Sequence, residues 1–200
     1  KVMAALGDGA PIDSWNLLFV PANAARLAKC GISVLDDDQE AFGAALIWKG
    51  KDPNAGAADE IETVKQVYAA IRPHIRTFNN AEYKDALANG DACVVMGYSG
   101  EEAKNGVEIA FIIPKEGALR WVDVIAIPKD ARHAGNALAF IDYLLQPAVT
   151  AAITDAVGYA NPNSDARALV DPGIAGNPGI YPAAEVQARL GHPPPAEAAQ

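Results

Sequence analysis

The sequence predicts an α/β fold, in which short β-strands alternate with helices along the chain. Short apolar runs that end at proline or glycine are typical of strands, whereas longer segments with apolar residues at helical spacing are typical of amphipathic helices. The two kinds of segment alternate, which favours layers of helix packed on sheet. With 200 residues, half of them hydrophobic, the chain can form one large domain or two small lobes.

The first half of the chain predicts one strand and three helices. The apolar run 32–35 is a strand candidate, and the acidic turn 36–40 after it is a favourable helix N-terminus because carboxylates cap the first turn. Glycine and proline then stop successive elements. The predicted helices are the one that runs from this turn to Trp48, 61–71 before Pro73, and 81–89 before Gly90.

The second half predicts three strands and three helices. Strands are expected at 92–97, at 107–113 before Pro114, and at 121–127 before Pro128. The expected helices are 134–145, a helix from Pro147 to Gly158, and 182–190. A tail at 191–200, rich in proline and alanine, is expected to be disordered.

Composition excludes several classes of protein. The formal net charge of -9 and the pI near 4.7 argue against nucleic-acid binding, because phosphates would be repelled. No apolar run approaches the length that a membrane span requires. The first residues lack the charged and apolar regions of a signal peptide, which leaves a cytosolic, an already processed or a fragmentary chain as alternatives.

No metal or phosphate site is expected. Cys30 and Cys93 lie far apart, without the spacing of a metal site, so they are either buried thiols or a disulfide formed in an oxidising compartment. The three histidines are scattered. The stretch Gly50-Lys51-Asp52 lacks the other residues of a phosphate loop, and the acidic turn lacks the glycine and the terminal glutamate of a calcium loop. No cofactor is predicted.

Ser99 raises the alternative of a serine hydrolase. The nucleophile elbow of such enzymes requires glycine two positions before and two positions after the serine. Gly97 meets the first requirement, but Glu101 stands in the second position. No acid–histidine pair is placed near Ser99 in the sequence. A hydrolase is therefore the minor alternative.

Acidic and aromatic residues gather at the ends of predicted elements, where α/β folds bind ligands. Glu40 stands at a helix start, Tyr98 and Glu101 at a strand end, and Tyr159 before a loop. Asp123 interrupts an apolar strand, where a carboxylate either faces solvent or pairs with a cation. As a set they suit an alkyl chain that carries ammonium groups, because carboxylates would bind the nitrogens and rings would cover the methylenes.

Seven stretches, in order along the chain, resemble the periplasmic polyamine-binding proteins of ABC importers, and most of all their putrescine receptors. They are Asp13-Ser-Trp15, Lys29-Cys-Gly-Ile-Ser33, Gly50-Lys-Asp-Pro-Asn54, Leu87-Ala-Asn-Gly-Asp-Ala-Cys93, Glu102-Ala-Lys-Asn-Gly106, Ile113-Pro-Lys-Glu-Gly117 and Asn177-Pro-Gly-Ile-Tyr-Pro182. The resemblance implies a non-enzymatic, periplasmic receptor with a type II binding-protein fold. Its implied partners are putrescine or spermidine and the membrane subunits of an ABC transporter.

The resemblance also implies an organisation into lobes. Residues 1–111 would form most of the second lobe. Residues 112–158 would form the hinge crossover and a remnant of the first lobe, and 159–190 would return to the second lobe. Cys30 and Cys93 match a pair that forms a disulfide in the family.

The resemblance assigns roles to individual residues. Glu40 and Asp123 match carboxylates that contact the polyamine, and Asp123 is expected to be the more enclosed of the two. Tyr98 stands where the family usually has tryptophan, Trp121 where it usually has phenylalanine, and Tyr159 matches a further aromatic contact. Glu101 is the candidate replacement for a family aspartate that follows Gly100.

The family has a further segment before the position of Lys1 that supplies most of the first lobe. If that segment is missing, binding should be weakened, and uncovered apolar helix faces should favour self-association. A sensor or interaction domain that no longer binds polyamine is the alternative function.

Overall fold

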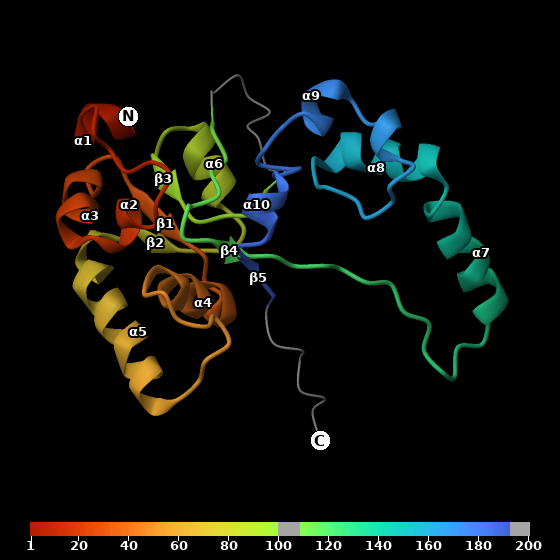
Figure 1. Ribbon diagram of the computed structural model, residues 1–200, viewed down its shortest axis with the longest axis horizontal. Helices are drawn as coiled ribbons and strands as arrows, with labels where there is room; N and C mark the ends of the chain where they lie inside the picture. The colour runs from red at the N-terminus through yellow and green to blue at the C-terminus, as the bar shows by residue number, and fades with distance from the viewer. Residues whose placement is uncertain (100–108, 193–200) are drawn as a thin grey trace. The chain divides into compact units, whose positions relative to one another are not determined.

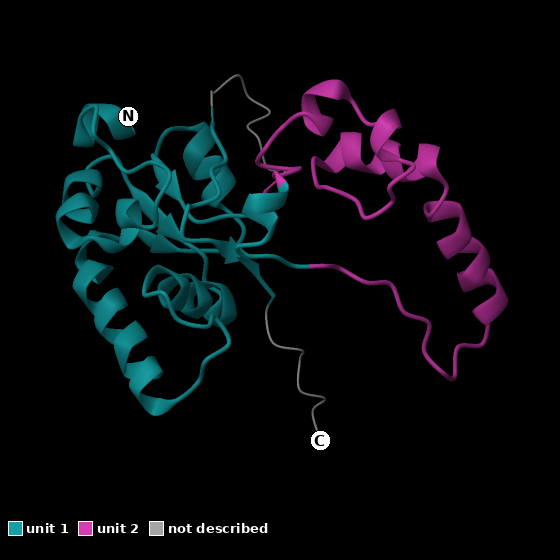
Figure 2. Ribbon diagram, in the orientation of Figure 1, with its two compact units in different colours: residues 1–98, 103–121, 184–200 teal, residues 99–102, 122–183 magenta. Residues whose placement is uncertain are grey.

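The computed structural model describes residues 1–99 and 109–192 (Figure 1). These residues divide into two compact units (Figure 2). Within the described part, unit 1 comprises residues 1–98, 109–121 and 184–192, and unit 2 comprises residue 99 and residues 122–183.

Unit 1 is built on a parallel three-stranded sheet with strand order β2-β1-β3. β1 (Ile32–Val34) lies in the centre, and β2 (Thr77–Phe78) and β3 (Val94–Val95) flank it. The helices of this unit are α1 (Val2–Leu6), α2 (Asn16–Phe19), α3 (Pro21–Leu27), α4 (Asp38–Trp48), α5 (Ala58–Ile71), η1 (Arg72–His74), α6 (Tyr83–Ala88) and α10 (Ala184–Gln187).

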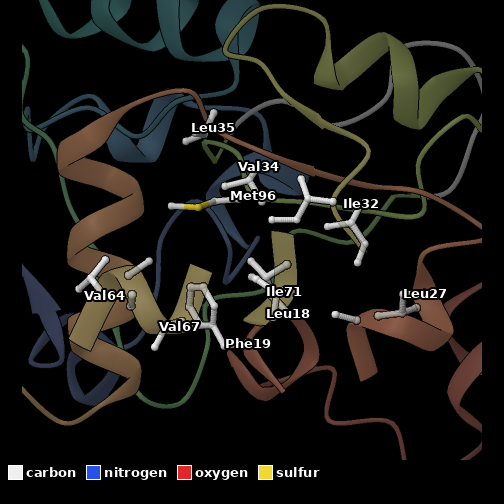
Figure 3. Close-up of a cluster of buried hydrophobic side chains, with 14 of the residues drawn as sticks. Leu18, Phe19, Leu27, Ile32, Val34, Leu35, Val64, Val67, Ile71 and Met96 are labelled. Atoms are coloured by element: carbon white, nitrogen blue, oxygen red, sulfur yellow. The ribbon is translucent and has the colours of Figure 1, made fainter. Parts of the chain in front are cut away.

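The main core of unit 1 lies between the central strand and the helices that pack on the sheet. All three residues of β1 are buried. Figure 3 shows side chains of β1 beside side chains from α2, α3 and α5. Phe19 of α2 contacts the rings of Trp15, Trp48 and Tyr68. This packing joins α4 to α2 and α5 in the core and so positions its first turn.

A second, two-stranded parallel sheet joins two distant parts of unit 1. β4 (Ala118–Leu119) pairs with β5 (Leu190–Gly191), and β4 packs against α4. Gly43 of α4 makes this approach possible, since a Cβ there would lie only 2.6 Å from the Leu119 side chain. The residues that follow β4 are thereby held beside α4.

Unit 2 is mainly helical and has a small core. Its helices are α7 (Ala134–Leu144), α8 (Pro147–Val157), η2 (Arg167–Leu169) and α9 (Pro172–Ala175). α8 ends at Gly158, which adopts the left-handed conformation that favours glycine. Ala151, Ala166 and Val170 form the buried cluster.

No single helix among the described residues has the length and apolar character to cross a membrane. The pair α7 and α8 meets the length and composition test only when the two are joined, and it bends by 74° between them.

The α/β class and most of the expected elements are confirmed. The strand at 32–35, the helices of the first half and the two helices between 134 and 158 are present, with ends shifted by a few residues. The strand at 92–97 shortens to Val94–Val95, and the helix at 182–190 shortens to α10. The sequence did not predict α1, α2, α3 or the two-residue strands β2, β4 and β5.

Two predicted strands are wrong. Residues 121–127 and the described part of 107–113 form no strand, because no neighbouring strand in the described part of the chain pairs with them. Residues 107 and 108 lie outside the described range. Gly191, the first residue of the tail that was expected to be disordered, belongs to β5. Residues 193–200 of the tail are likewise outside the described range.

Candidate ligand-binding site

The candidate site in unit 1 lies at the carboxyl edge of the three-stranded sheet. β1 and β3 are parallel neighbours, so the residues that follow them emerge at the same edge. Glu40 follows β1, in the first turn of α4, and Tyr98 follows β3. Such an edge is where open α/β sheets bind ligands.

Glu40 is held in place by the start of α4. Asp37 caps the helix, and its carboxylate accepts a hydrogen bond from the Glu40 backbone N–H at 3.0 Å. The Glu40 residue is only 7% exposed. Burial, and to a smaller degree the negative charge of Asp37, raise the pKa of Glu40 to about 7. A carboxyl group in this state gains from pairing with a cation.

Trp121 joins Glu40 at this edge. It lies two residues beyond β4, and its indole Nε1–H donates a hydrogen bond to Glu40 Oε1. The Trp121 residue is 41% exposed, so part of it is accessible to a ligand. The combination of a buried carboxylate and an accessible aromatic residue suits an ammonium group on an alkyl chain.

Tyr98 is half-buried against the main core. Its backbone N–H donates to the Tyr83 hydroxyl at 3.4 Å. Gly97 lies beside the same ring, since a Cβ there would meet the Tyr83 side chain at 2.6 Å. Tyr83 therefore fixes where the chain leaves β3, and with it the position of Tyr98.

The remaining predicted site residues are outside unit 1 or outside the described residues. Asp123 and Tyr159 belong to unit 2 and both are exposed. In this chain the burial of the two carboxylates is the reverse of the expected order: Glu40 is buried in the first turn of α4, whereas Asp123 is exposed in a segment with no strand partner among the described residues. Glu101 lies outside the described residues.

A hydrolase or metal site finds no support in the described part of the chain. Its histidines lie in η1, before α7, and next to Arg120, and none of them is hydrogen-bonded to Ser99. No group of three or more potential metal-ligating side chains occurs among the described residues.

Comparison with known proteins identifies the family. The bacterial extracellular solute-binding protein family matches residues 4–182. The chain belongs to this family. It is 46% identical to the putrescine-binding periplasmic protein PotF of Escherichia coli and 44% identical to SpuD, the putrescine-binding periplasmic protein of Pseudomonas aeruginosa. Each alignment covers 95% of this chain and 54% of the relative, so the chain spans about half the length of these relatives.

Two solved structures share the fold. The spermidine/putrescine ABC transporter substrate-binding protein PotD of Streptococcus pneumoniae superimposes with a TM-score of 0.79 at 23% identity, over 95% of this chain and 58% of that one. The TpPotD lipoprotein of Treponema pallidum gives 0.70 at 26% identity, over 82% and 52%. The expected binding-protein fold is thus confirmed.

The motifs that carry the resemblance have structural roles in this solute-binding protein. Cys30 and Cys93 form the expected disulfide, with their Cα atoms 5.5 Å apart. Ser14 Oγ and Trp15 N–H both donate to the Glu116 carboxylate, and Trp15 Nε1–H donates to Gly117 O at 2.8 Å. These bonds join the first and the sixth motif and hold the segment that leads into β4 and Trp121.

Sequence reasoning proposed Glu40, Tyr98 and Trp121 as site residues but did not predict the bond that joins Glu40 to Trp121. It expected the acidic turn 36–40 to cap the helix but did not single out Asp37 as the capping residue. The position of Asp37 three residues before Glu40 was a usable signal, because a capping carboxylate accepts from the N–H three residues later.

Proposed function

We propose that this chain binds putrescine or another polyamine, including spermidine, as part of a periplasmic receptor that delivers it to an ABC transporter. The observation that carries this proposal is the buried residue Glu40, hydrogen-bonded to the exposed residue Trp121 at the sheet edge. The names of the relatives PotF and SpuD support the choice of ligand.

The chemistry of the site favours binding over catalysis. Glu40 offers an acceptor for one ammonium group, and a charge-assisted hydrogen bond of this kind is stronger than a neutral one. Trp121 and Tyr98 offer aromatic surface for the cation and the adjoining methylenes. The family description and the names of the relatives are those of binding proteins, and we infer that the chain is not an enzyme.

The second ammonium group requires an acceptor from another part of the protein. We propose Asp123 and Tyr159 of unit 2, with Glu101, for this role. Unit 1 would correspond to the second lobe of the receptor and unit 2 to a part of the first, while the finer boundaries predicted from sequence stay a proposal.

We also propose that the isolated chain self-associates. The proposal is supported by the exposed apolar side chains of unit 2, among them Val124 at 83% exposure and Phe140 at 58%. Exposed apolar surface of this extent favours contact between copies.

The proposal is tested by titration calorimetry with putrescine, with butylamine as the ligand that lacks one ammonium group. Glu40→Gln should lower the affinity for putrescine, whereas Asp59→Asn, which removes an exposed carboxylate from α5, should not. Equal affinity for putrescine in the wild type and in Glu40→Gln would refute the proposed site.

A further inference from the structure

Trp121 occupies a special place in the chain. After Trp121 the chain leaves unit 1, and the long segment 122–183 of unit 2 begins at Val122. Its indole N–H donates a hydrogen bond to Oε1 of Glu40, which lies 81 positions earlier in the chain. The bond therefore links the first turn of α4 to the point at which the chain leaves unit 1.

Two hydrogen bonds position Glu40, one at its backbone and one at its side chain. The capping bond to Asp37 fixes its backbone, but it leaves the side-chain torsions free. The bond from Trp121 then fixes the carboxylate. Among the described residues no other hydrogen bond reaches this carboxylate, so Oε2 is left for a further donor.

We propose that Trp121 is a positioning residue, whose indole N–H holds Oε1 of the Glu40 carboxylate so that Oε2 is presented to a ligand ammonium group. This role rests on the proposed polyamine-binding function. Phenylalanine could supply the same aromatic wall but not this donor, so the indole N–H adds a function that the ring alone lacks.

The electrostatic setting makes this donor important. Burial and Asp37 favour the neutral form of the Glu40 carboxyl and raise its pKa to about 7, whereas a hydrogen bond donated to the carboxylate favours the charged form.

α2, α5 and β4 pack against α4. α2 and β4 carry no charged residue, and α5 contributes the Tyr68 hydroxyl, which donates to Ala41 O at 2.8 Å. Asp37, half-buried, and the exposed Asp38 are the acidic neighbours in the first turn.

The chain contains its own controls for this bond, because it has three tryptophans. Trp15 Nε1–H donates to the Gly117 carbonyl and Trp48 Nε1–H to the Asn16 side-chain oxygen, each at 2.8 Å. Neither of these acceptors titrates. Only the acceptor of Trp121 is a carboxyl group.

The first experiment follows the three indole ¹H–¹⁵N resonances of the ligand-free protein from pH 5 to pH 9. The Trp121 resonance, assigned by its loss in Trp121→Phe, should shift with a midpoint near the Glu40 pKa of about 7. The other two should stay unchanged. In Glu40→Gln the Trp121 resonance should also become independent of pH. A Trp121 resonance that does not titrate in the wild type would overturn the proposal.

The second experiment measures putrescine binding as a function of pH. Trp121→Phe should weaken binding about tenfold, which is about 1.4 kcal/mol, and should move the pH midpoint of binding upward because the Glu40 carboxylate has lost its donor. Trp48→Phe removes an indole donor that is not hydrogen-bonded to Glu40, so the pH midpoint of putrescine binding should not change.

An unchanged pH midpoint in Trp121→Phe would overturn the positioning role even if the affinity falls, because a purely structural role predicts only lost stability. If the wild type binds no diamine, the proposed function fails, but the indole titration still decides whether Trp121 holds the Glu40 carboxylate.

Discussion

At the scale of single residues, the chemistry of the candidate site depends on one carboxyl group in a place that disfavours its charge. Glu40 is buried at the start of α4, and its pKa is raised from 4.5 to about 7 by burial and by Asp37. The folded protein therefore binds a proton at this site more tightly than the unfolded chain does. Stability from Glu40 is fully present below pH 4.5 and is lost as the pH rises through 7.

Glu40→Gln should remove this dependence. The difference in unfolding free energy between the variant and the wild type should rise by up to about 3 kcal/mol from pH 4.5 to pH 8, because each pKa unit corresponds to about 1.4 kcal/mol. Denaturant unfolding at several pH values measures it. Parallel stability profiles for the two proteins would contradict the burial of a titrating Glu40.

The two described candidate carboxylates, Glu40 and Asp123, should contribute unequally to the affinity for putrescine. Glu40 is buried, whereas Asp123 is exposed, and exposed ion pairs contribute only about 0–1 kcal/mol. In the 200-residue chain Glu40→Gln should therefore weaken putrescine binding more than Asp123→Asn. Calorimetry on both variants tests this order, and a larger loss in Asp123→Asn would show that Asp123 becomes enclosed when ligand binds.

Sequence reasoning reached these residues but not their contacts. The capping signals placed Glu40 at a helix start, and the turn after the apolar run placed Tyr98 beyond a strand. The bond between Trp121 and Glu40 depends on how β4 packs against α4, and β4 is a two-residue strand whose partner lies at the far end of the chain. No local pattern encodes such a pairing.

At the scale of elements, the disulfide reinforces the centre of the sheet. Cys30 precedes β1 and Cys93 precedes β3, two strands that pair with each other. The bridge closes a loop with a sequence separation of 63, for which the chain-entropy relation gives about 4 kcal/mol. It joins the chain at the start of the two strands that precede Glu40 and Tyr98.

Gly31, between Cys30 and β1, should be required in this place. It has φ +94, and a Cβ would collide with the Asp91 carbonyl oxygen. Gly31→Ala should cost about 3 kcal/mol, since it adds a backbone clash to the strain of a positive φ. Gly50→Ala is the matched control, because Gly50 has φ +70 but open space around it, and should cost about 1 kcal/mol. Denaturant unfolding measures both losses of unfolding free energy. Equal losses in Gly31→Ala and Gly50→Ala would argue against the clash.

The segment 121–127 shows where prediction from local pattern fails. Its alternating apolar residues resemble a strand, but a strand needs a partner, and none pairs with it in the described part of the chain. Val122, Val124 and Ile125 are accordingly exposed. The helices were predicted more successfully because their hydrogen bonds are internal and their apolar spacing is local.

At the scale of the whole molecule, the two units differ in how well they are packed. Unit 1 has a large core around β1, whereas the buried cluster of unit 2 has three residues. Side chains on both long helices of unit 2 remain exposed, including Leu138 and Phe140 of α7 and Ile153 of α8. An apolar surface without cover favours association.

The chain should therefore self-associate through unit 2. Sedimentation velocity should give an average mass that rises with protein concentration, and the double variant Leu138→Ser, Phe140→Ser should reduce this rise. The matched control is Ile61→Ser, which removes an exposed apolar side chain from unit 1. A monomeric mass at all concentrations would contradict the prediction.

The most direct test of the central claim is calorimetry of putrescine binding to the 200-residue chain at low and high salt. We predict a weak affinity, with Kd above about 10 μM, because Asp123 is exposed and an ion pair with it remains hydrated and screened. Binding should weaken further with salt and in Glu40→Gln. No binding at millimolar putrescine by the folded chain, or sub-micromolar binding that resists salt, would contradict the account.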